Sequence, residues 1–179
     1  MKEQLSELIA KSTSAIGDEY FQLMLDGGDP VYRERVYCYE LYHQMRILWD
    51  IDSPFRLNGE VDKAAHPILR ELGADHVKPD FLVHTPGDMN GNHAIIEVKH
   101  KQASRKGIKK DLESLSLFRL EVGYERAIYL VYGYDLDIEY WIQKVGTIAN
   151  SYEKLAMIEL WVHMGAGSPA IHVATVGNV

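Results

Sequence analysis

The chain has 179 residues, of which 46% are hydrophobic and 25% are charged, as in one ordinary globular domain rather than a disordered or fibrous chain. Its formal net charge of −7 argues against a protein that coats polyanions in general. The single cysteine, Cys38, excludes an internal disulfide and fits a reducing compartment. No secretory leader is evident, and no apolar stretch approaches the ~20 residues of a membrane span. We therefore expect one cytoplasmic domain over residues 1–179, with no membrane partner.

Hydrophobic spacing and turn residues divide the chain into helices and strands. Helical spacing runs from Leu5 to Ile16, and residues 20–25 either extend this helix or start a second one before the break at Gly27–Pro30. Residues 64–72 are interpreted as a short helix or a loop. The other predicted elements are a helix over Tyr32–Trp49, strands over Phe55–Val61, Phe81–Val83 and Ala94–Val98, a helix over Lys109–Val122, a strand over Ala127–Tyr132, a helix over Leu136–Tyr152, and strands over Ala156–His163 and Ala170–Val176. This order predicts an α/β (α+β) domain with a central mixed sheet flanked by helices.

The hairpin predicted from the second and third strands carries charged residues at one end. Asp80 precedes its first strand, and Glu97 and Lys99 lie at the end of its second. Because residues two apart on a strand point to the same side, Glu97 and Lys99 share a face, and Asp80 can reach the same place from the partner strand. Surface ion pairs, Glu97 with Lys99 and Asp80 with Lys78, are the simplest interpretation of these charges.

A divalent cation gives the same charges a second interpretation. Two carboxylates on a largely apolar hairpin need a partner or solvent, and Mg²⁺ is commonly held by one or two carboxylates together with waters and substrate phosphates. A lysine beside such a metal can organise or help deprotonate a water, or stabilise charge on the phosphate in the transition state. The candidate metal ligands are therefore Asp80, Glu97 and the backbone carbonyl of Val98, and Lys99 is a candidate catalytic residue.

Three further acidic residues and one amide are candidates for the same site. Glu40 lies within an aromatic stretch of the long helix predicted before the sheet, and Gln44 follows one turn later on the same face. Glu60 and Asp62 end the first strand and share a face, so they would extend the acidic cluster. Exposure to solvent at a helix surface or a strand end is the alternative for each of them.

Together these residues resemble the PD-(D/E)xK nuclease superfamily, which includes restriction endonucleases. The resemblance implies a restriction-endonuclease-like core of helix, three-stranded meander, helix and strand, which matches residues of about 32–132 and leaves 1–31 and 133–179 as elaborations. It places the first acidic residue of the motif on Asp80, the second on Glu97 and the lysine on Lys99, and it gives Glu40 the role of the upstream helical glutamate, a further metal ligand. It implies a metal-dependent endonuclease or exonuclease that uses Mg²⁺ or Mn²⁺ to hydrolyse phosphodiester bonds.

A basic run follows the acidic residues directly. Six of the twelve residues from Lys99 to Lys110 are Lys or Arg, and a solvated loop and helix start is the simplest interpretation of such a run. In a nuclease of the implied shape, the run lies beside the metal site and positions the nucleic-acid backbone without reading its sequence. DNA is the expected substrate. The candidate nucleic-acid-binding residues are Lys101, Arg105, Lys106, Lys109 and Lys110.

Two other functions remain open from the sequence. A non-catalytic nucleic-acid-binding or regulatory subunit that retains the nuclease fold would bind DNA through the basic run without cutting it, although carboxylates repel phosphates unless a metal lies between them. A protein–protein module would need no metal. A homodimer or a partner subunit is compatible with each function, and the extra N-terminal helices or C-terminal strands are available for such contacts.

Overall fold

The computed structural model describes residues 2–60, 67–71 and 77–179. Its centre is a six-stranded mixed sheet whose strands lie side by side in chain order. They are β3 (Arg56–Gly59), β4 (Phe81–His84), β5 (Asn92–His100), β6 (Arg126–Tyr132), β7 (Ile158–His163) and β8 (Ile171–Val176). Strands β5, β6 and β7 are parallel, whereas β3–β4, β4–β5 and β7–β8 pair antiparallel. The predicted α/β class, with a central mixed sheet flanked by helices, is thus confirmed.

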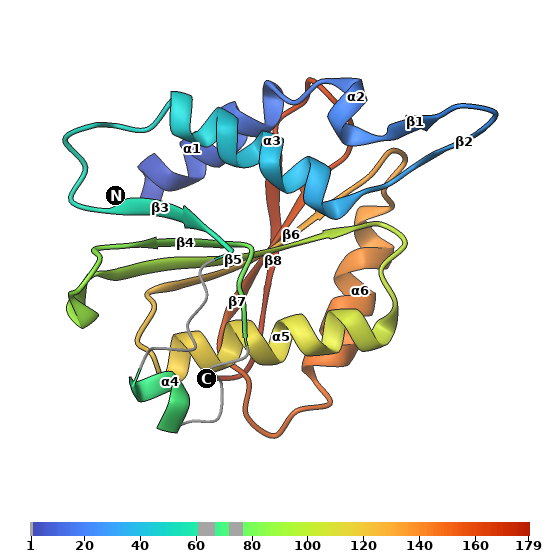
Figure 1. Ribbon diagram of the computed structural model, residues 1–179. Helices are drawn as coiled ribbons and strands as arrows, with labels where there is room; N and C mark the ends of the chain where they lie inside the picture. The colour runs from blue at the N-terminus through green and yellow to red at the C-terminus, as the bar shows by residue number, and fades with distance from the viewer. Residues whose placement is uncertain (1, 61–66, 72–76) are drawn as a thin grey trace.

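Helices cover both faces of the sheet (Figure 1). One face packs against α1 (Lys2–Ser14), α2 (Asp18–Phe21) and α3 (Glu34–Ile47), and the other against α5 (Arg105–Leu120) and α6 (Ile138–Ala149). Side chains alternate between these two cores: Ile95 faces α5 and α6, whereas its neighbour Ile96 faces α1 and α3. Burial on both sides explains the continuous apolar runs of the central strands.

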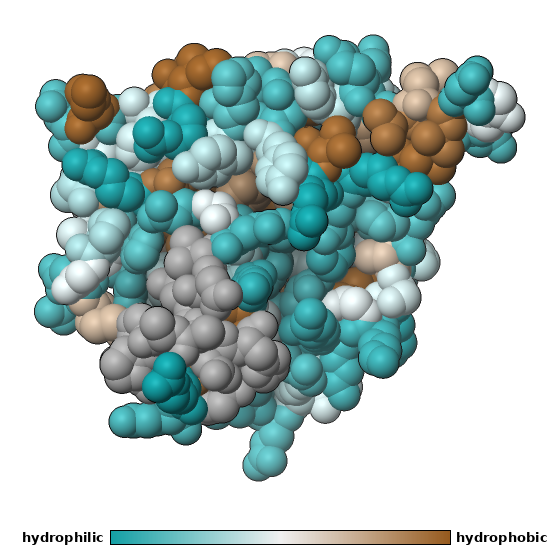
Figure 2. All heavy atoms as spheres, in the orientation of Figure 1, coloured by the Kyte–Doolittle hydropathy of each residue, from teal (hydrophilic) through white to brown (hydrophobic). Residues whose placement is uncertain are grey.

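The segment around Gly27 forms a hairpin that the sequence did not predict. Strands β1 (Leu23–Leu25) and β2 (Gly28–Val31) pair antiparallel and project from the body of the molecule (Figure 1). Gly27 has φ +70°, a left-handed conformation that glycine adopts without a Cβ clash. The predicted break is in the right place. Tyr20 and Phe21 belong to a second helix, which was one of the two expectations, but residues 23–25 before the break form a strand. Apolar side chains of β1 are exposed, and they gather on this hairpin in Figure 2.

Polar side chains set several element ends that apolar spacing did not locate. Helix α5 begins at Arg105 rather than Lys109, because the Ser104 Oγ accepts a hydrogen bond from the Gly107 N–H at 3.1 Å and caps the helix. Asp137 caps α6 in the same way. A short helix, α4 (Pro67–Glu71), and a 3₁₀ turn, η1 (Met89–Gly91), complete the described elements. Each described helix is too short or too polar to cross a membrane.

Candidate active site

The end of β5 brings two of the predicted carboxylates together. The ladder between β4 and β5 ends where Phe81 pairs with Ile96, and the same register places Asp80 opposite Glu97. The Asp80 Oδ2 accepts a hydrogen bond from the backbone N–H of Val98 at 2.7 Å. This bond to the residue after Glu97 fixes the Asp80 carboxylate next to Glu97.

Lys99 lies on the same side of β5 as Glu97 and contacts a helix on each face of the sheet. Its Nζ donates a hydrogen bond to the Oε1 of Glu34, the first residue of α3, at 2.8 Å. The same Nζ lies 3.5 Å from the Oδ2 of Asp111 on α5. The side chain is only 18% exposed. Lys99 is thus held between carboxylates from the two helical layers, at the place where the β4–β5 ladder has ended.

Helix α5 contributes two buried polar side chains to this place. The Ser114 Oγ donates a hydrogen bond to the Glu97 Oε1 at 2.9 Å, and Glu97 is 6% exposed. Asp111 is 5% exposed, and its Oδ2 makes no hydrogen bond within the described residues, although the Lys99 ammonium lies nearby. A buried carboxylate oxygen in this state has unused capacity to accept a hydrogen bond or to contact a cation.

Four carboxylates and one ammonium group share the site. Burial raises the pKa of Glu97 well above its ordinary value, and neighbouring Asp80 and Asp111 raise it further. Burial also raises the pKa of Asp80, and it raises that of Asp111 to about 7 despite the opposing effect of Lys99. Burial alone would lower the pKa of Lys99, but Asp111 and Glu34 outweigh it and leave the pKa above its ordinary value. Because burial and mutual repulsion disfavour the ionised form of these carboxyl groups, a cation bound between them would offset that cost.

These side chains line a cavity of 270 Å³ that α3, α5 and the adjoining strand ends enclose. Among the predicted site residues, Asp80, Glu97, Lys99, Glu60 and Lys110 lie together here. The full lining consists of Glu34, Arg35, Glu60, Val77, Lys78, Asp80, Glu97, Lys99, Lys110, Asp111 and Ser114. Acidic and basic groups from five separate parts of the chain therefore meet in one place.

Glu40 and Gln44 do not line this cavity. Glu40 follows Glu34 by six residues, which places it about 120° away around the axis of α3. Its Oε1 accepts a hydrogen bond from the Gln44 Nε2 at 2.6 Å, as expected for neighbours on one helix face. The helical glutamate that reaches the motif residues is Glu34, not the predicted Glu40.

The other predicted ligands have separate surroundings. Val98 contacts the site through its N–H, which binds Asp80. Glu60 lines the cavity and forms an exposed ion pair with Arg35, whose Nε lies 3.3 Å from the Glu60 Oε1. Asp62 lies outside the described residues.

The fold divides the predicted basic run. Lys110 lines the cavity, and Arg105 and Lys106 are exposed at the start of α5. Lys109 is exposed too, with its Nζ 5.5 Å from the centre of the Tyr152 ring. Lys101 instead donates a hydrogen bond from its Nζ to the Tyr134 carbonyl at 2.6 Å. Four of the five cations therefore lie on the first two turns of α5, where Lys110 lines the cavity, whereas Lys101 contacts the protein's own backbone.

Glu34, Asp111 and Ser114 were not predicted, although the sequence holds a signal for each. Glu34 occupies the same helical stripe as the buried residues Cys38, Leu41 and Met45, at spacings of four, three and four residues. Asp111 and Ser114 likewise fall on the buried face of α5, next to Leu112 and Leu115. Charged or polar residues at apolar helix positions point inward, and here they point toward the site.

The donor set fits a hard divalent cation that retains water ligands. Asp80 and Glu97 supply two opposed carboxylates, and Mg²⁺ needs only one or two from the protein when waters and phosphates complete its coordination. Within the described residues, no three His, Cys, Asp or Glu side chains form a complete metal site. Two carboxylates are the number that an open magnesium or manganese site requires from the protein. Asp111, whose Oδ2 lies 3.5 Å from the Lys99 ammonium, lines the same cavity.

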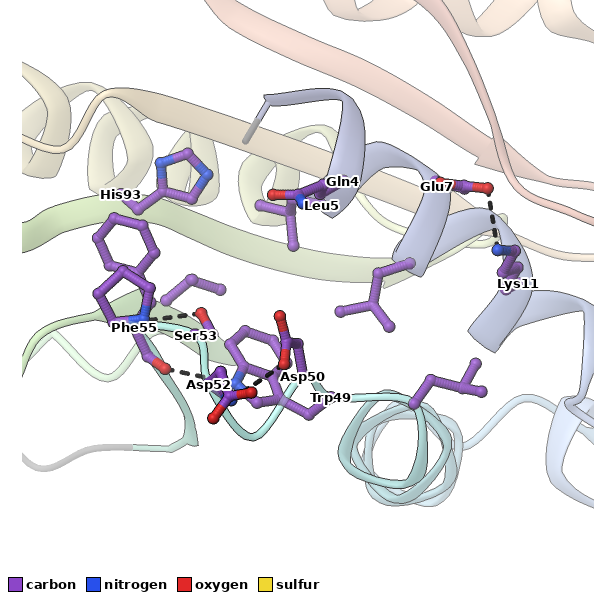
Figure 3. Close-up of a pocket in the computed structure, with 14 residues that line it drawn as sticks. Gln4, Leu5, Glu7, Lys11, Trp49, Asp50, Asp52, Ser53, Phe55 and His93 are labelled. Carbon is purple, nitrogen blue, oxygen red and sulfur yellow. Dashed lines mark hydrogen bonds and ion pairs between the residues drawn. The ribbon is translucent and has the colours of Figure 1, made fainter.

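A larger cavity of 480 Å³ lies elsewhere, between α1, the end of α3 and the strands below them (Figure 3). Its walls are mainly apolar and aromatic: the His93 ring stacks on Phe55 at 4.8 Å, and the Trp49 Nε1 donates to the Phe55 carbonyl at 3.3 Å. The lysine in its lining, Lys11, pairs with Glu7 along one exposed helix face at 2.9 Å. Its acidic residues, Glu7, Asp50 and Asp52, are all exposed, whereas Glu97 and Asp111 are buried, so the smaller cavity is the better candidate for metal chemistry.

Comparisons of the chain with known families, with curated proteins and with solved structures give no match. The argument for function therefore depends on the fold, the site geometry and the charges. These three observations concern the same few residues at the end of β5.

Proposed function

We propose that this chain is a divalent-metal-dependent nuclease of the PD-(D/E)xK kind, which hydrolyses phosphodiester bonds with DNA as the expected substrate. The observation that carries the proposal is the placement of Asp80 opposite Glu97, with Lys99 on the same side of β5 and all three in one cavity. A set of surface ion pairs would leave these groups in solvent, whereas Glu97 is buried and Lys99 nearly so.

The order of elements supports the same proposal. Helix α3, the meander β3–β4–β5, helix α5 and strand β6 follow one another from residue 34 to residue 132. This is the order of helix, three strands, helix and strand that the resemblance implies for a restriction-endonuclease-like core. The described elements before α3 and after β6 are then additions to that core.

In the proposed reaction, Asp80 and Glu97 would hold Mg²⁺ or Mn²⁺. The bound ion would polarise the phosphoryl group and lower the pKa of a coordinated water. Val98 and Ser114 orient the two carboxylates through the hydrogen bonds at 2.7 Å and 2.9 Å. Hydrolysis then forms one bond from the water oxygen to phosphorus and breaks one bridging phosphorus–oxygen bond, whose oxygen takes up a proton.

Lys99 acts in this scheme as a fixed positive charge. Asp111 and Glu34 raise its pKa above the ordinary value, which favours the protonated amine and a hydrogen-bond donor over a base. An ammonium group held by Glu34 and Asp111 can orient the attacking water and stabilise the charge that develops on the phosphate. Glu34 and Asp111 are positioning residues, since they act through Lys99.

The start of α5 supports a phosphate-containing substrate. Arg105, Lys106, Lys109 and Lys110 occupy its first two turns, and its first turn has no acidic residue. Cations at this end of a helix oppose the helix dipole and destabilise the helix slightly. The same end attracts phosphate through its free N–H groups, so the arrangement favours anion binding over helix stability.

A cleavage assay tests the proposal. Single-stranded, duplex and branched DNA, and RNA, are incubated with the protein in Mg²⁺, in Mn²⁺ or in EDTA. Cleavage is expected with either metal and not in EDTA, and Asp80→Asn and Lys99→Met should each lose at least about 100-fold in rate, as for removal of one electrostatic contact in a transition state. Exposed residues away from the site provide the controls Glu139→Gln, on α6, and Lys154→Met, in the connection between α6 and β7, which should keep the parent rate.

Three results would contradict the assignment. Cleavage in EDTA would exclude the metal, and cleavage that survives both site substitutions would exclude the site. Tight DNA binding without any cleavage, in either metal, would favour the non-catalytic subunit instead. Calorimetric titration with Mn²⁺ gives an independent readout, since binding should be lost in Asp80→Asn and kept in Glu139→Gln.

A further inference from the structure

The outward face of α3 carries a stripe of basic and aromatic side chains that the proposed reaction does not use. Arg35, Tyr39, His43 and Arg46 are all exposed, and Tyr39 is 60% exposed. Their spacings of four, four and three residues place them within an arc of about 80° on the helix. The α3 stripe, as we call these four residues, therefore forms one continuous surface.

The α3 stripe begins at the candidate active site. Arg35 lines the cavity and pairs with Glu60 at the end of β3. Tyr42 lies beside the stripe and contacts the same strands: its Oη donates to the Leu57 carbonyl at 3.4 Å, and its ring stacks on Phe81 at 6.3 Å. The stripe thus lies on the exposed surface of α3 next to the side that contacts β3 and β4. It leads away from the cavity along the helix.

The view in Figure 2 shows the exposed side of α3. Hydrophilic and weakly polar side chains, in teal and pale shades, cover most of it, and the apolar groups gather at the ends. The carboxylate of Glu40 is directed to another side of α3, where Gln44 binds it. On a chain of net charge −7, this surface is locally suited to an anion.

Cations interleaved with exposed aromatic rings suit one class of polyanion in particular. Single-stranded nucleic acid binds to protein by placing its backbone on basic residues and stacking its bases on aromatic rings. A duplex offers no free base face for a ring such as Tyr39, because its bases already stack on one another. A bound duplex would use the two arginines and leave the tyrosine in solvent.

We propose that the α3 stripe binds a single-stranded segment of nucleic acid, with a base stacked on Tyr39 and the backbone on Arg35 and Arg46, so that the strand continues into the cavity. From Arg35 to Arg46 the helix rises about 16 Å, enough for about five nucleotides at ~3.4 Å per stacked step. The inference rests on the proposed nuclease function and adds to it that the substrate has unpaired bases on the α3 side of the site.

Binding measurements test this inference on the full chain. Fluorescence anisotropy is recorded with a labelled single-stranded 12-mer and with the corresponding duplex, with Ca²⁺ as the divalent cation. Tyr39→Ala should weaken single-strand binding by about 5- to 150-fold, the range for loss of one stacked base. Tyr39→Phe, which keeps the ring, should stay within twofold of the parent, and duplex binding should change in neither variant.

Matched controls separate stacking from charge and from misfolding. Tyr140 is a comparably exposed tyrosine on α6 (54%), and Tyr140→Ala should bind both DNAs as the parent does. Arg46→Gln should weaken single-strand binding and reduce its dependence on salt by about one phosphate contact. Circular dichroism of every variant should match the parent, since each altered side chain is exposed.

The inference is overturned if Tyr39→Ala leaves single-strand binding unchanged, or if it weakens duplex binding equally. Its failure is distinct from that of the proposed nuclease function. If metal-dependent cleavage is lost in Asp80→Asn but single-strand binding does not depend on Tyr39, only the proposed role of the α3 stripe is refuted. If the parent protein binds single strands in a Tyr39-dependent way but never cleaves them, the proposed role of the α3 stripe is supported and the proposed nuclease function is refuted.

Discussion

In the metal-free protein, the free energy of unfolding of Asp111→Asn minus that of the parent should be larger at neutral pH than at acidic pH. The pKa of Asp111 is raised from 3.8 to about 7, first by burial. The folded protein therefore holds a proton on Asp111 between about pH 4 and pH 7, whereas the unfolded chain releases it. Stability that depends on this group is full below pH 4 and is lost as the pH rises to 7.

The size of the effect follows from the shift. About three pKa units at 1.36 kcal/mol each correspond to ~4 kcal/mol of unfolding free energy, and sharing of protons with neighbouring Glu97 and Asp80 will reduce it. The amide introduced by Asp111→Asn does not titrate, so the stability of this variant minus that of the parent should grow by about 2–4 kcal/mol from pH 4 to pH 7.5.

Urea denaturation in EDTA at four pH values measures this difference. Addition of Mg²⁺ at pH 7.5 should reduce the stability difference between Asp111→Asn and the parent, because a bound cation offsets the repulsion between the parent's buried carboxylates. The matched control is Glu113→Gln, an exposed carboxylate on the same helix, whose difference from the parent should not vary with pH by more than ~0.5 kcal/mol. A stability difference that is constant from pH 4 to pH 7.5 would refute the burial argument for Asp111.

Three further predictions concern stability. Lys99→Met should lower the unfolding free energy by about 3 kcal/mol at pH 8 in urea titrations, because it leaves buried carboxylates without their cation, and the loss should shrink at pH 5. Glu159→Gln removes the carboxylate that binds Arg126, a side chain that is 3% exposed, through two hydrogen bonds of 2.8 and 2.7 Å, so the melting temperature should fall by about 10 °C. Burial lowers the pKa of His163 to about 4, so the folded state resists a proton that the unfolded chain accepts below pH 6.5. When the pH falls from 6.5 to 4, the unfolding free energy of His163→Gln should therefore decrease by about 3 kcal/mol less than that of the parent. An equal decrease in both proteins would refute the role given to His163.

The strand-borne half of the site was predictable because strands have a simple geometry. Side chains alternate strictly along a strand, so Glu97 and Lys99 had to share a side wherever β5 lay. The turn-rich connection predicted a hairpin in which the strand after Asp80 pairs with the strand that carries them, and the observed register places Asp80 opposite Glu97. Two short-range rules were enough to bring these three residues together.

The helix-borne half required knowledge of which helix face is buried. Glu40 was preferred because aromatic residues surround it in sequence, but on a helix sequence neighbours lie about 100° apart. The buried stripe of α3 passes through Glu34 and leaves Glu40 on another side. Asp111 was missed for a related reason. A helix expected to begin at Lys109 leaves out Ile108, whose burial with Leu112 and Leu115 shows that Asp111 lies on the buried face of α5.

The β1–β2 hairpin was missed because its pattern is too short to distinguish from a helix end. Three apolar residues before two glycines suit either structure, and here the left-handed conformation at Gly27 allows the chain to reverse into β2. The exposed apolar side chains of β1 gave no period-two signal, since both of its faces are exposed. Periodicity can locate only those strands that bury one face.

The charges of α3 connect the two proposals. Its first residue, Glu34, points toward the site and holds Lys99 at 2.8 Å, whereas the next residue, Arg35, begins the outward α3 stripe. A strand bound along the stripe would bring its phosphates to the cavity at the end of the helix where Lys99 is already fixed. Repulsion between those phosphates and the site carboxylates would then oppose entry unless a divalent cation were bound. Divalent cations should therefore strengthen single-strand binding in the parent but not in Asp80→Asn, which separates the metal site from the stripe by affinity alone.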